Sequence, residues 1–156
     1  MRHHAVPFLL LAACAPPSGG TKGDRAELLR MHEQARADHL EKRADRMVAS
    51  FADSLRFVAA GEVTIVPPEQ NRARLQAYFD RSTFQAWDDI APPILRISPD
   101  GRMAYKIVQK RVRLTAPDSL GRTVAEHVVY AWVEMYEKPA DRWILMAVAS
   151  TDRPGP

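Results

Sequence analysis

The side chains best suited to acid–base or metal chemistry in this sequence are its histidines. His32 and His39 lie seven residues apart in a helix-like pattern, and His127 lies in a strand-like segment. Seven helical residues rise about 10 Å, and zinc-binding helices use spacings of three or four. His127 could add a third ligand, but no carboxylate spacing completes a metal site. We therefore expect buried, hydrogen-bonded histidines and predict no metal and no other cofactor.

Several aromatic and polar side chains could instead line a pocket for a small molecule, since such sites combine apolar walls with a few polar groups. The candidates are Trp87, Tyr105, Gln109, His127 and Trp143. Within such a pocket the candidate catalytic groups are His39, His127 and Tyr105, with His39 favoured because it lies nearer the middle of the expected fold. Each of these residues could also be ordinary core.

The carboxylates give weaker signals. Asp88 and Asp89 are adjacent, but neighbours in a strand point to opposite faces, so we do not expect them to share a proton. Asp53 is interpreted as a turn or capping residue.

Three segments have the hydrophobic spacing of helices. They run from 24 to about 42, from 45 to about 51, and from 67 to about 79. Asp24 is a good N-cap residue, and Glu27 completes something close to a capping box. In the third segment, proline occupies its usual place in the first turn.

Strand-like runs occupy most of the remaining chain. They cover residues 55–59, 62–66, 83–88, 94–98, 102–115, 122–138 and 143–151, separated by turns rich in glycine, proline and aspartate. In the run from 102, apolar residues hold odd positions as far as Ile107 and even positions from Val108. One regular strand cannot bury both sets on one face, so we predict a β-bulge between Ile107 and Lys110 that bends the sheet.

The strand at 122–138 has one face rich in aromatic residues. Tyr130, Trp132 and Tyr136 share this face with Glu126 and Glu134. It could be a dimer surface, because aromatic residues are enriched at interfaces, or a solvent face with scattered aromatics. We predict a homodimer formed through the sheet.

The N-terminus has the features of an export signal. A basic start is followed by an apolar run, and Leu11-Ala12-Ala13-Cys14 resembles the bacterial lipobox, whose cysteine is acylated. We predict a signal peptide at 1–13, lipidation of Cys14 and a flexible tether at 14–23. The membrane is then a partner through this lipid. Ala15 resembles the pattern sent to the outer membrane, where the protein would face the periplasm of the bacterial cell envelope.

The composition narrows the remaining possibilities. The chain of 156 residues is 46% hydrophobic and 26% charged, as expected for one globular domain. Its net charge of +3 comes from basic residues interspersed with acids, so no basic patch predicts nucleic-acid binding. The single cysteine excludes an intramolecular disulfide. No apolar stretch reaches the roughly 18 residues of a spanning helix.

The order of these elements resembles the nuclear transport factor 2-like superfamily, in particular its SnoaL-like and ketosteroid isomerase-like members. Residues 45–53 are similar to the end of a family helix, and Arg142-Trp143-Ile144-Leu145 is similar to the last family strand. The resemblance spans 24–153 and implies an α+β cone, in which N-terminal helices pack on a strongly curved antiparallel or mixed sheet. It places the general base of the isomerases at Ala59, which cannot move a proton, and Glu62 is the nearest carboxylate.

Three functions are compatible with this sequence. The first is a membrane-anchored, non-catalytic module that binds a small molecule or a protein. The alternative is a cone-pocket enzyme of isomerase, dehydratase or hydrolase type, acting on a small hydrophobic substrate by acid–base chemistry. The third is an assembly factor that uses the sheet face, which would require an exposed apolar patch.

Overall fold

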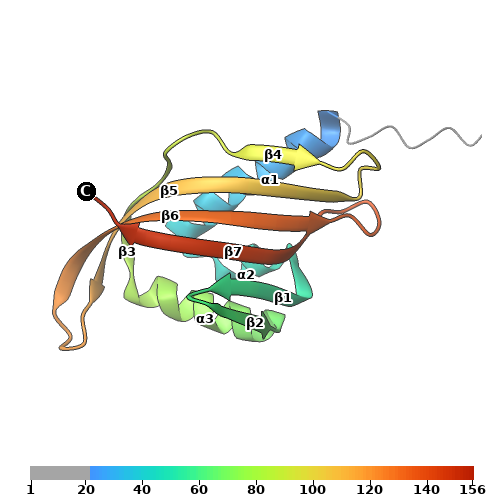
Figure 1. Cartoon of the computed structure of the whole chain (residues 1–156). Coiled ribbons are helices and arrows are strands. Elements are labelled where there is room, and N and C mark those ends of the chain that lie inside the picture. Colours follow the sequence, from blue (N-terminus) through green and yellow to red (C-terminus); the bar gives the residue numbers. More distant parts are fainter. Residues whose placement is uncertain (1–21) are drawn as a thin grey trace, which may run out of the picture.

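The computed structural model describes residues 22–156, so Cys14 and most of the predicted tether lie outside the described residues. Three helices pack beside a seven-stranded sheet (Figure 1). The helices are α1 (Lys22–Leu40), α2 (Ala44–Val48) and α3 (Pro68–Arg81). The strands are β1 (Phe51–Ala59), β2 (Glu62–Val66), β3 (Thr83–Asp89), β4 (Ile94–Ile97), β5 (Met103–Pro117), β6 (Thr123–Glu137) and β7 (Ile144–Pro154).

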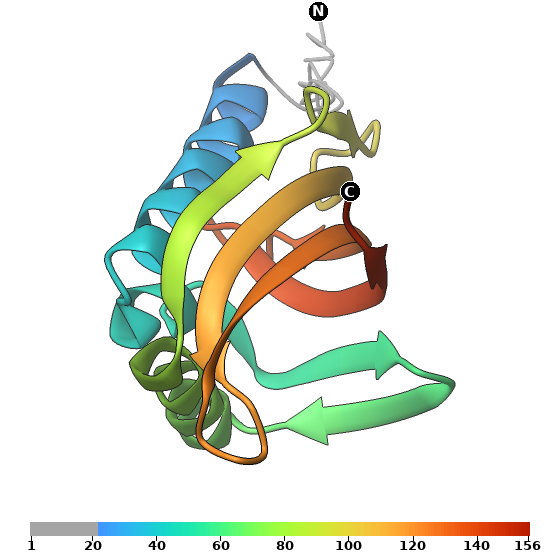
Figure 2. The same cartoon turned by 90° about the vertical axis from the view of Figure 1, so that its left-hand side faces the viewer.

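The sheet is mixed and open. Its strand order is β2-β1-β7-β6-β5-β3, and β4 pairs with β5. The β1–β7 pair is parallel and the other pairs are antiparallel. Figure 2 shows the strands curling into an open arc with the helices on one side. The predicted α+β cone, with helices packed on a strongly curved sheet, is confirmed.

The helix boundaries differ in detail from the predicted ones. Helix α1 already includes Lys22 and Gly23, so Asp24 lies within the helix rather than at its N-cap. Its buried carboxylate accepts hydrogen bonds from Lys138 Nζ at 2.6 Å and Trp143 Nε1 at 3.2 Å, which ties α1 to the end of the sheet. Helix α2 ends at Val48, and Phe51 begins β1 instead of ending a helix.

The predicted β-bulge in β5 is wrong. The register between β5 and β6 runs without a break from Met103↔Glu137 to Pro117↔Thr123. Every even residue from Ala104 to Ala116 is buried, and the odd residues from Met103 to Arg113 are exposed. The prediction failed because it assumed an entirely apolar inner face, whereas Lys106 and Lys110 are among the buried even residues.

Irregular pairing occurs elsewhere in the sheet. Register shifts fall between Phe51 and Arg56 where β1 meets β7, and between Phe84 and Ala86 where β3 meets β5. A third lies between Met135 and Tyr136 where β6 meets β7. Such irregularities bend strands and increase twist, so they fit the curl of this sheet better than the expected kink in β5 does.

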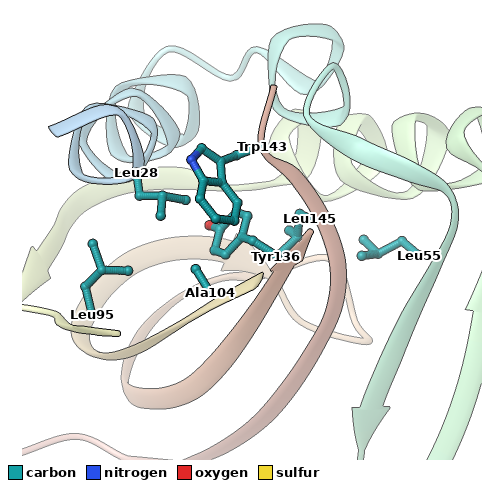
Figure 3. Close-up of a cluster of buried hydrophobic side chains, with 7 residues drawn as sticks. All are labelled: Leu28, Leu55, Leu95, Ala104, Tyr136, Trp143 and Leu145. Carbon is teal, nitrogen blue, oxygen red and sulfur yellow. The ribbon is translucent and has the colours of Figure 1, made fainter. Parts of the chain in front are cut away.

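The hydrophobic core joins the first turns of α1 to the sheet. Figure 3 shows Trp143 between Leu28 on α1 and the strand residues Tyr136 and Leu145. Leu55, Leu95 and Ala104 complete this cluster of buried side chains. A second cluster, formed by Trp87, Val112, Leu114 and Ala116, packs farther along β5. The two clusters fix the sheet to the helices and leave space between them for a cavity.

Candidate functional site

A cavity of about 520 Å³ lies between the helices and the inner face of the sheet. Side chains from all three helices and from β1, β3, β5, β6 and β7 line it. The walls are mostly apolar, and a volume of several hundred Å³ is typical of small-molecule sites. Two groups of buried polar side chains and one histidine interrupt this apolar surface.

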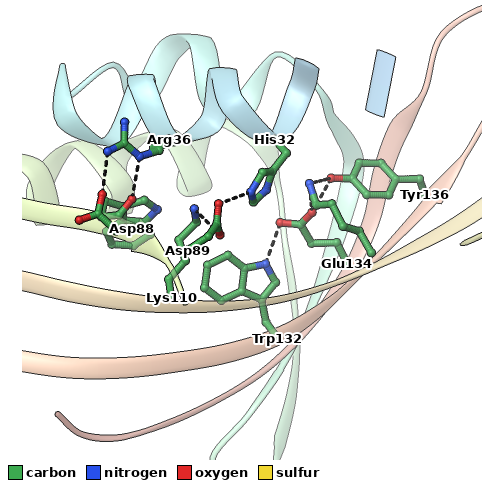
Figure 4. A network of polar contacts seen from close by, with 10 residues as sticks. His32, Arg36, Asp88, Asp89, Lys110, Trp132, Glu134 and Tyr136 are labelled. Atoms are coloured by element: carbon green, nitrogen blue, oxygen red, sulfur yellow. Dashed lines mark hydrogen bonds and ion pairs between the residues drawn. The ribbon is translucent and has the colours of Figure 1, made fainter. Parts of the chain in front are cut away.

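The first polar group is centred on Glu134 of β6 (Figure 4). Its Oε2 lies 2.6 Å from Lys106 Nζ and accepts a hydrogen bond of 2.5 Å from the Tyr136 hydroxyl. Its Oε1 accepts a hydrogen bond of 2.8 Å from Trp132 Nε1. Lys106 Nζ also donates to the Tyr136 oxygen at 3.0 Å. Both carboxylate oxygens of Glu134 are therefore occupied.

These contacts set the ionisation of the group. Burial opposes charge on Glu134, but the Lys106 ammonium and the donors from Tyr136 and Trp132 outweigh it and lower the pKa of this carboxyl. Burial and the neighbouring Glu134 charge raise the pKa of Tyr136, which stays protonated as a donor. Glu134 is thus held as a carboxylate at neutral pH and is a weak base.

The second polar group joins α1, β3 and β5 through Asp89. Its Oδ2 lies 2.8 Å from His32 Nε2, and its Oδ1 lies 2.8 Å from Lys110 Nζ. Burial would raise the pKa of Asp89, but contacts with Lys110 and His32 lower it, so the carboxylate is charged. Since a carboxylate only accepts hydrogen bonds, His32 Nε2 carries the proton.

His39 of α1 stacks on the ring of Trp87, with ring centroids 3.8 Å apart, and lines the cavity. Its Nδ1 lies 2.7 Å from the Ala35 carbonyl oxygen, so Nδ1 carries the proton and Nε2 keeps the lone pair. Burial lowers the pKa of His39 to about 4, and the Lys110 charge adds to this effect. His39 is therefore neutral at pH 7.

The structure separates the residues predicted to line the pocket. Trp87 and Trp143 line the cavity, as does His39. Tyr105, Gln109 and His127 do not: all three are exposed on the other face of the sheet. Tyr105 and Gln109 occupy odd positions of β5, which face outward, and the ring of His127 contacts the carbonyl oxygen of Pro156. Tyr105 and His127 are therefore not placed to act in the cavity.

The aromatic face of β6 is also not where we expected it. Tyr130, Trp132, Glu134 and Tyr136 line the cavity, so this face of β6 turns toward the helices and not toward the outside of the sheet. The outer face carries exposed apolar side chains instead, among them Ile94, Met103, Tyr105, Ile107 and Met135. A homodimer through the sheet stays a prediction, and it would have to use these residues.

The remaining candidate carboxylates do not form a catalytic pair in the cavity. Asp88 pairs with Arg36 at 2.7 Å while Asp89 points to the second polar group, so the two do not share a proton. Asp53 is an exposed residue within β1 rather than a turn or cap. Ala59 and Glu62 are exposed at the β1–β2 turn, outside the cavity.

One group of side chains has metal-ligand character. Nitrogen and oxygen atoms of His32, Glu33 and Asp89 lie within 4.8 Å of one another. However, both oxygens of Asp89 already contact His32 and Lys110, and the Lys110 ammonium would repel a cation. These donors fit a salt-bridged cluster better than a metal site.

The polar residues of the cavity that sequence reasoning missed are the buried Lys106 and Lys110 and the partly buried Glu134. The signal was present, since both lysines occupy even positions in phase with Val108 and Val112. Lysine is almost never fully buried unless paired, so a lysine in the buried phase of a strand indicates an acidic partner on a neighbouring strand.

The fold is shared with solved structures. The sequence matches no protein-family model and no curated protein. An NTF2-like protein from Cytophaga hutchinsonii superposes with a TM-score of 0.63 at 15% identity, over 81% of this chain and 96% of that one. A ketosteroid isomerase-like protein from Erwinia carotovora atroseptica gives 0.65 at 10% identity, over 86% and 100%. A protein from Kribbella flavida gives 0.67 at 21% identity, over 84% and 91%.

The chain therefore has the nuclear transport factor 2-like fold, and the predicted resemblance to that superfamily is confirmed at the level of fold. At these identities the similarity carries no activity, because this fold hosts unrelated functions. The function has to be inferred from the cavity itself.

The lowered pKa of His39 predicts a pH-dependent stability. Between pH 6.5 and 4 the unfolded chain binds a proton at His39 that the folded protein does not, so the free energy of unfolding falls as the pH is lowered. This loss amounts to roughly 3 kcal/mol at pH 4. His39→Phe keeps a ring against Trp87 but lacks this titration.

Urea unfolding of the wild type and His39→Phe at several pH values checks this prediction. The free energy of unfolding of the wild type minus that of His39→Phe should be constant above pH 7 and fall by roughly 3 kcal/mol by pH 4. Protonation of Asp89 and Glu134 at low pH also destabilises the fold, because the pKa values of both carboxyl groups are lowered. Both proteins contain these residues, so this effect cancels in the comparison. A difference that does not vary with pH would contradict the assignment.

Proposed function

We propose that this protein is a non-catalytic module that binds a small, largely apolar molecule in the cavity of its cone. The observation that carries the proposal is a mostly apolar cavity of about 520 Å³ whose buried acids and bases are engaged with one another. Such a site offers a large apolar contact area and a few fixed polar groups, the usual composition of a binding pocket.

The state of the polar groups argues against acid–base catalysis. An efficient general base has a pKa near the working pH, whereas the pKa of His39 is about 4. The pKa of Glu134 is lowered as well, and both of its oxygens accept contacts from neighbouring residues. None of these groups is poised to take a proton at neutral pH.

The alternative of a cone-pocket enzyme now depends on His39 alone among its predicted catalytic residues, because Tyr105 and His127 lie outside the cavity. The one observation in its favour is the fixed tautomer, which leaves His39 Nε2 as an acceptor. A bound substrate that raised the pKa of His39 would be needed to make it an effective base.

We also propose that the domain is held at a membrane by a lipid on Cys14, in the bacterial cell envelope and facing the periplasm from the outer membrane. The support is the lipobox-like sequence at the N-terminus. Among residues 22–156, each helix is either too short or too polar to cross a bilayer. Anchoring would keep the cavity near the membrane, where apolar molecules are concentrated.

Binding is tested with a neutral, apolar fluorescent probe, N-phenyl-1-naphthylamine. We expect saturable binding with enhanced probe emission, because the cavity would shield the probe from water. Ala35→Phe, which places a ring into the cavity from α1, should weaken binding at least tenfold. Ala37→Phe on the same helix, outside the cavity lining, is the matched control and should bind as the wild type does.

Equal binding by the two phenylalanine variants would show that the probe does not occupy this cavity. Absence of binding by the wild type would remove the proposed function.

The anchor is tested by metabolic labelling of the full chain with a radioactive fatty acid in a bacterial host. The wild type should incorporate label and sediment with membranes, and Cys14→Ala should do neither, because the acylated thiol is lost. A wild-type chain without label would refute the lipoprotein assignment and leave the binding proposal untouched.

A further inference from the structure

The ammonium group of Lys110 has an incomplete set of partners inside the cavity. Lys110 is 2% exposed, and within residues 22–156 its Nζ meets one polar atom, Asp89 Oδ1 at 2.8 Å, without well-aligned hydrogen-bond geometry. An ammonium has three N–H donors. At least two donors therefore have no acceptor among the described residues, which is costly for a buried charge.

Lys106 provides the contrast within the same strand. Its Nζ contacts both the Glu134 carboxylate and the Tyr136 oxygen, and it lies 5.3 Å from the Tyr136 ring centroid. Lys106 is therefore nearly satisfied by the protein. Lys110 is the buried cation that still has donors to offer to a ligand.

The charges around the cavity favour an anion. Six basic side chains line it, namely Arg30, Arg36, Arg46, Lys106, Lys110 and Arg142. Three acidic side chains line it, namely Glu27, Asp38 and Glu134, and Asp89 lies behind Lys110, so basic groups remain in excess. Arg36 and Arg46 pair with acids, but Arg30 and Arg142 form no ion pair with any described residue. A cavity lined by an excess of one charge attracts ligands of the opposite charge.

We propose that the cavity binds a small organic acid, with its carboxylate on Lys110 and its apolar body against the aromatic wall. This inference rests on the proposed binding function and names the class of ligand. Trp87, Tyr130 and Trp132 supply the aromatic surface. A carboxylate fits better than a doubly charged headgroup, because the ammonium of Lys110 offers free N–H donors but its charge is already shared with Asp89, so a second negative charge on the ligand would be buried without a partner.

Asp89 has a defined role in this arrangement. It is the internal counter-ion of Lys110, so it competes with a ligand carboxylate for the same ammonium. Asp89→Asn keeps one oxygen to accept from Lys110 and places its NH2 group toward His32, whose Nε2 can accept this hydrogen bond in the other tautomer. The substitution removes the competing charge. This substitution should tighten the binding of a carboxylate and leave the binding of a neutral ligand unchanged.

The test compares octanoate with octan-1-ol by isothermal titration calorimetry of the full chain at pH 7.5. The two probes have the same chain length and differ in the charged headgroup. We expect the wild type to bind octanoate at least tenfold more tightly. Lys110→Met should abolish this preference and keep octan-1-ol binding, whereas the exposed control Lys22→Met should keep the preference.

Each outcome decides one of the proposals. Equal affinities for the two probes in the wild type would overturn the carboxylate inference and leave the binding function standing, whereas binding of neither would overturn both. A preference for octanoate that persists in Lys110→Met would overturn the claim that the carboxylate binds to Lys110. If Lys110→Met does not fold, Asp89→Asn decides: octanoate binding that is unchanged or weaker would overturn the assignment.

Discussion

Two lysines buried on the inner face of β5 are the constraint on which the rest of the structure depends. Burying an ammonium without a partner costs several kcal/mol, so Lys106 and Lys110 each require an acid. Both acids lie on the strands that neighbour β5. Glu134 is the register partner of Lys106 on β6, and Asp89 is the register partner of Lys110 on β3.

This arrangement fixes the register on both sides of β5. A shift of one residue along either neighbouring strand would move the acid to the other face and leave a lysine unpaired inside the cone. Hydrophobic alternation alone would distinguish the inner face from the outer face less clearly, since the outer face also carries large apolar residues such as Ile107 and Met135. The ion pairs therefore specify which face of the sheet turns inward.

The same pairs determine the chemistry of the cavity. They hold Glu134 and Asp89 as carboxylates, and the charge of Lys110 helps to keep His39 neutral. The cavity thus has fixed charges between aromatic walls, and neither His39 nor Glu134 takes a proton readily near pH 7. This combination is the physical basis of the proposed binding function.

Much of the fold could be predicted from sequence, because helical and alternating patterns identify elements well. The helices, the strands and their turns were placed to within a few residues, apart from the start of β1. Segment 51–54 was missed because Phe51 extended the helical pattern that begins at 45, whereas β1 begins at Phe51 and pairs with β7.

The cavity was harder to predict because it depends on which residues of each strand face inward. Tyr105 and Gln109 were assigned to it from residue type, but they occupy the outward phase of β5. Lys106 and Lys110 were overlooked because charged residues are expected on the outside. Only the register, which brings Glu134 and Asp89 opposite them, accounts for their burial.

The most direct test of this account is a double-mutant cycle on Lys106 and Glu134, measured by urea unfolding at pH 7. Lys106→Met and Glu134→Gln should each destabilise the protein by about 3–5 kcal/mol, because each leaves one buried charge unpaired. The double variant, with neither charge, should lose at least about 2 kcal/mol less than the two single losses combined. Losses that add to within about 0.5 kcal/mol would contradict the claim that this ion pair holds the inner face of the sheet.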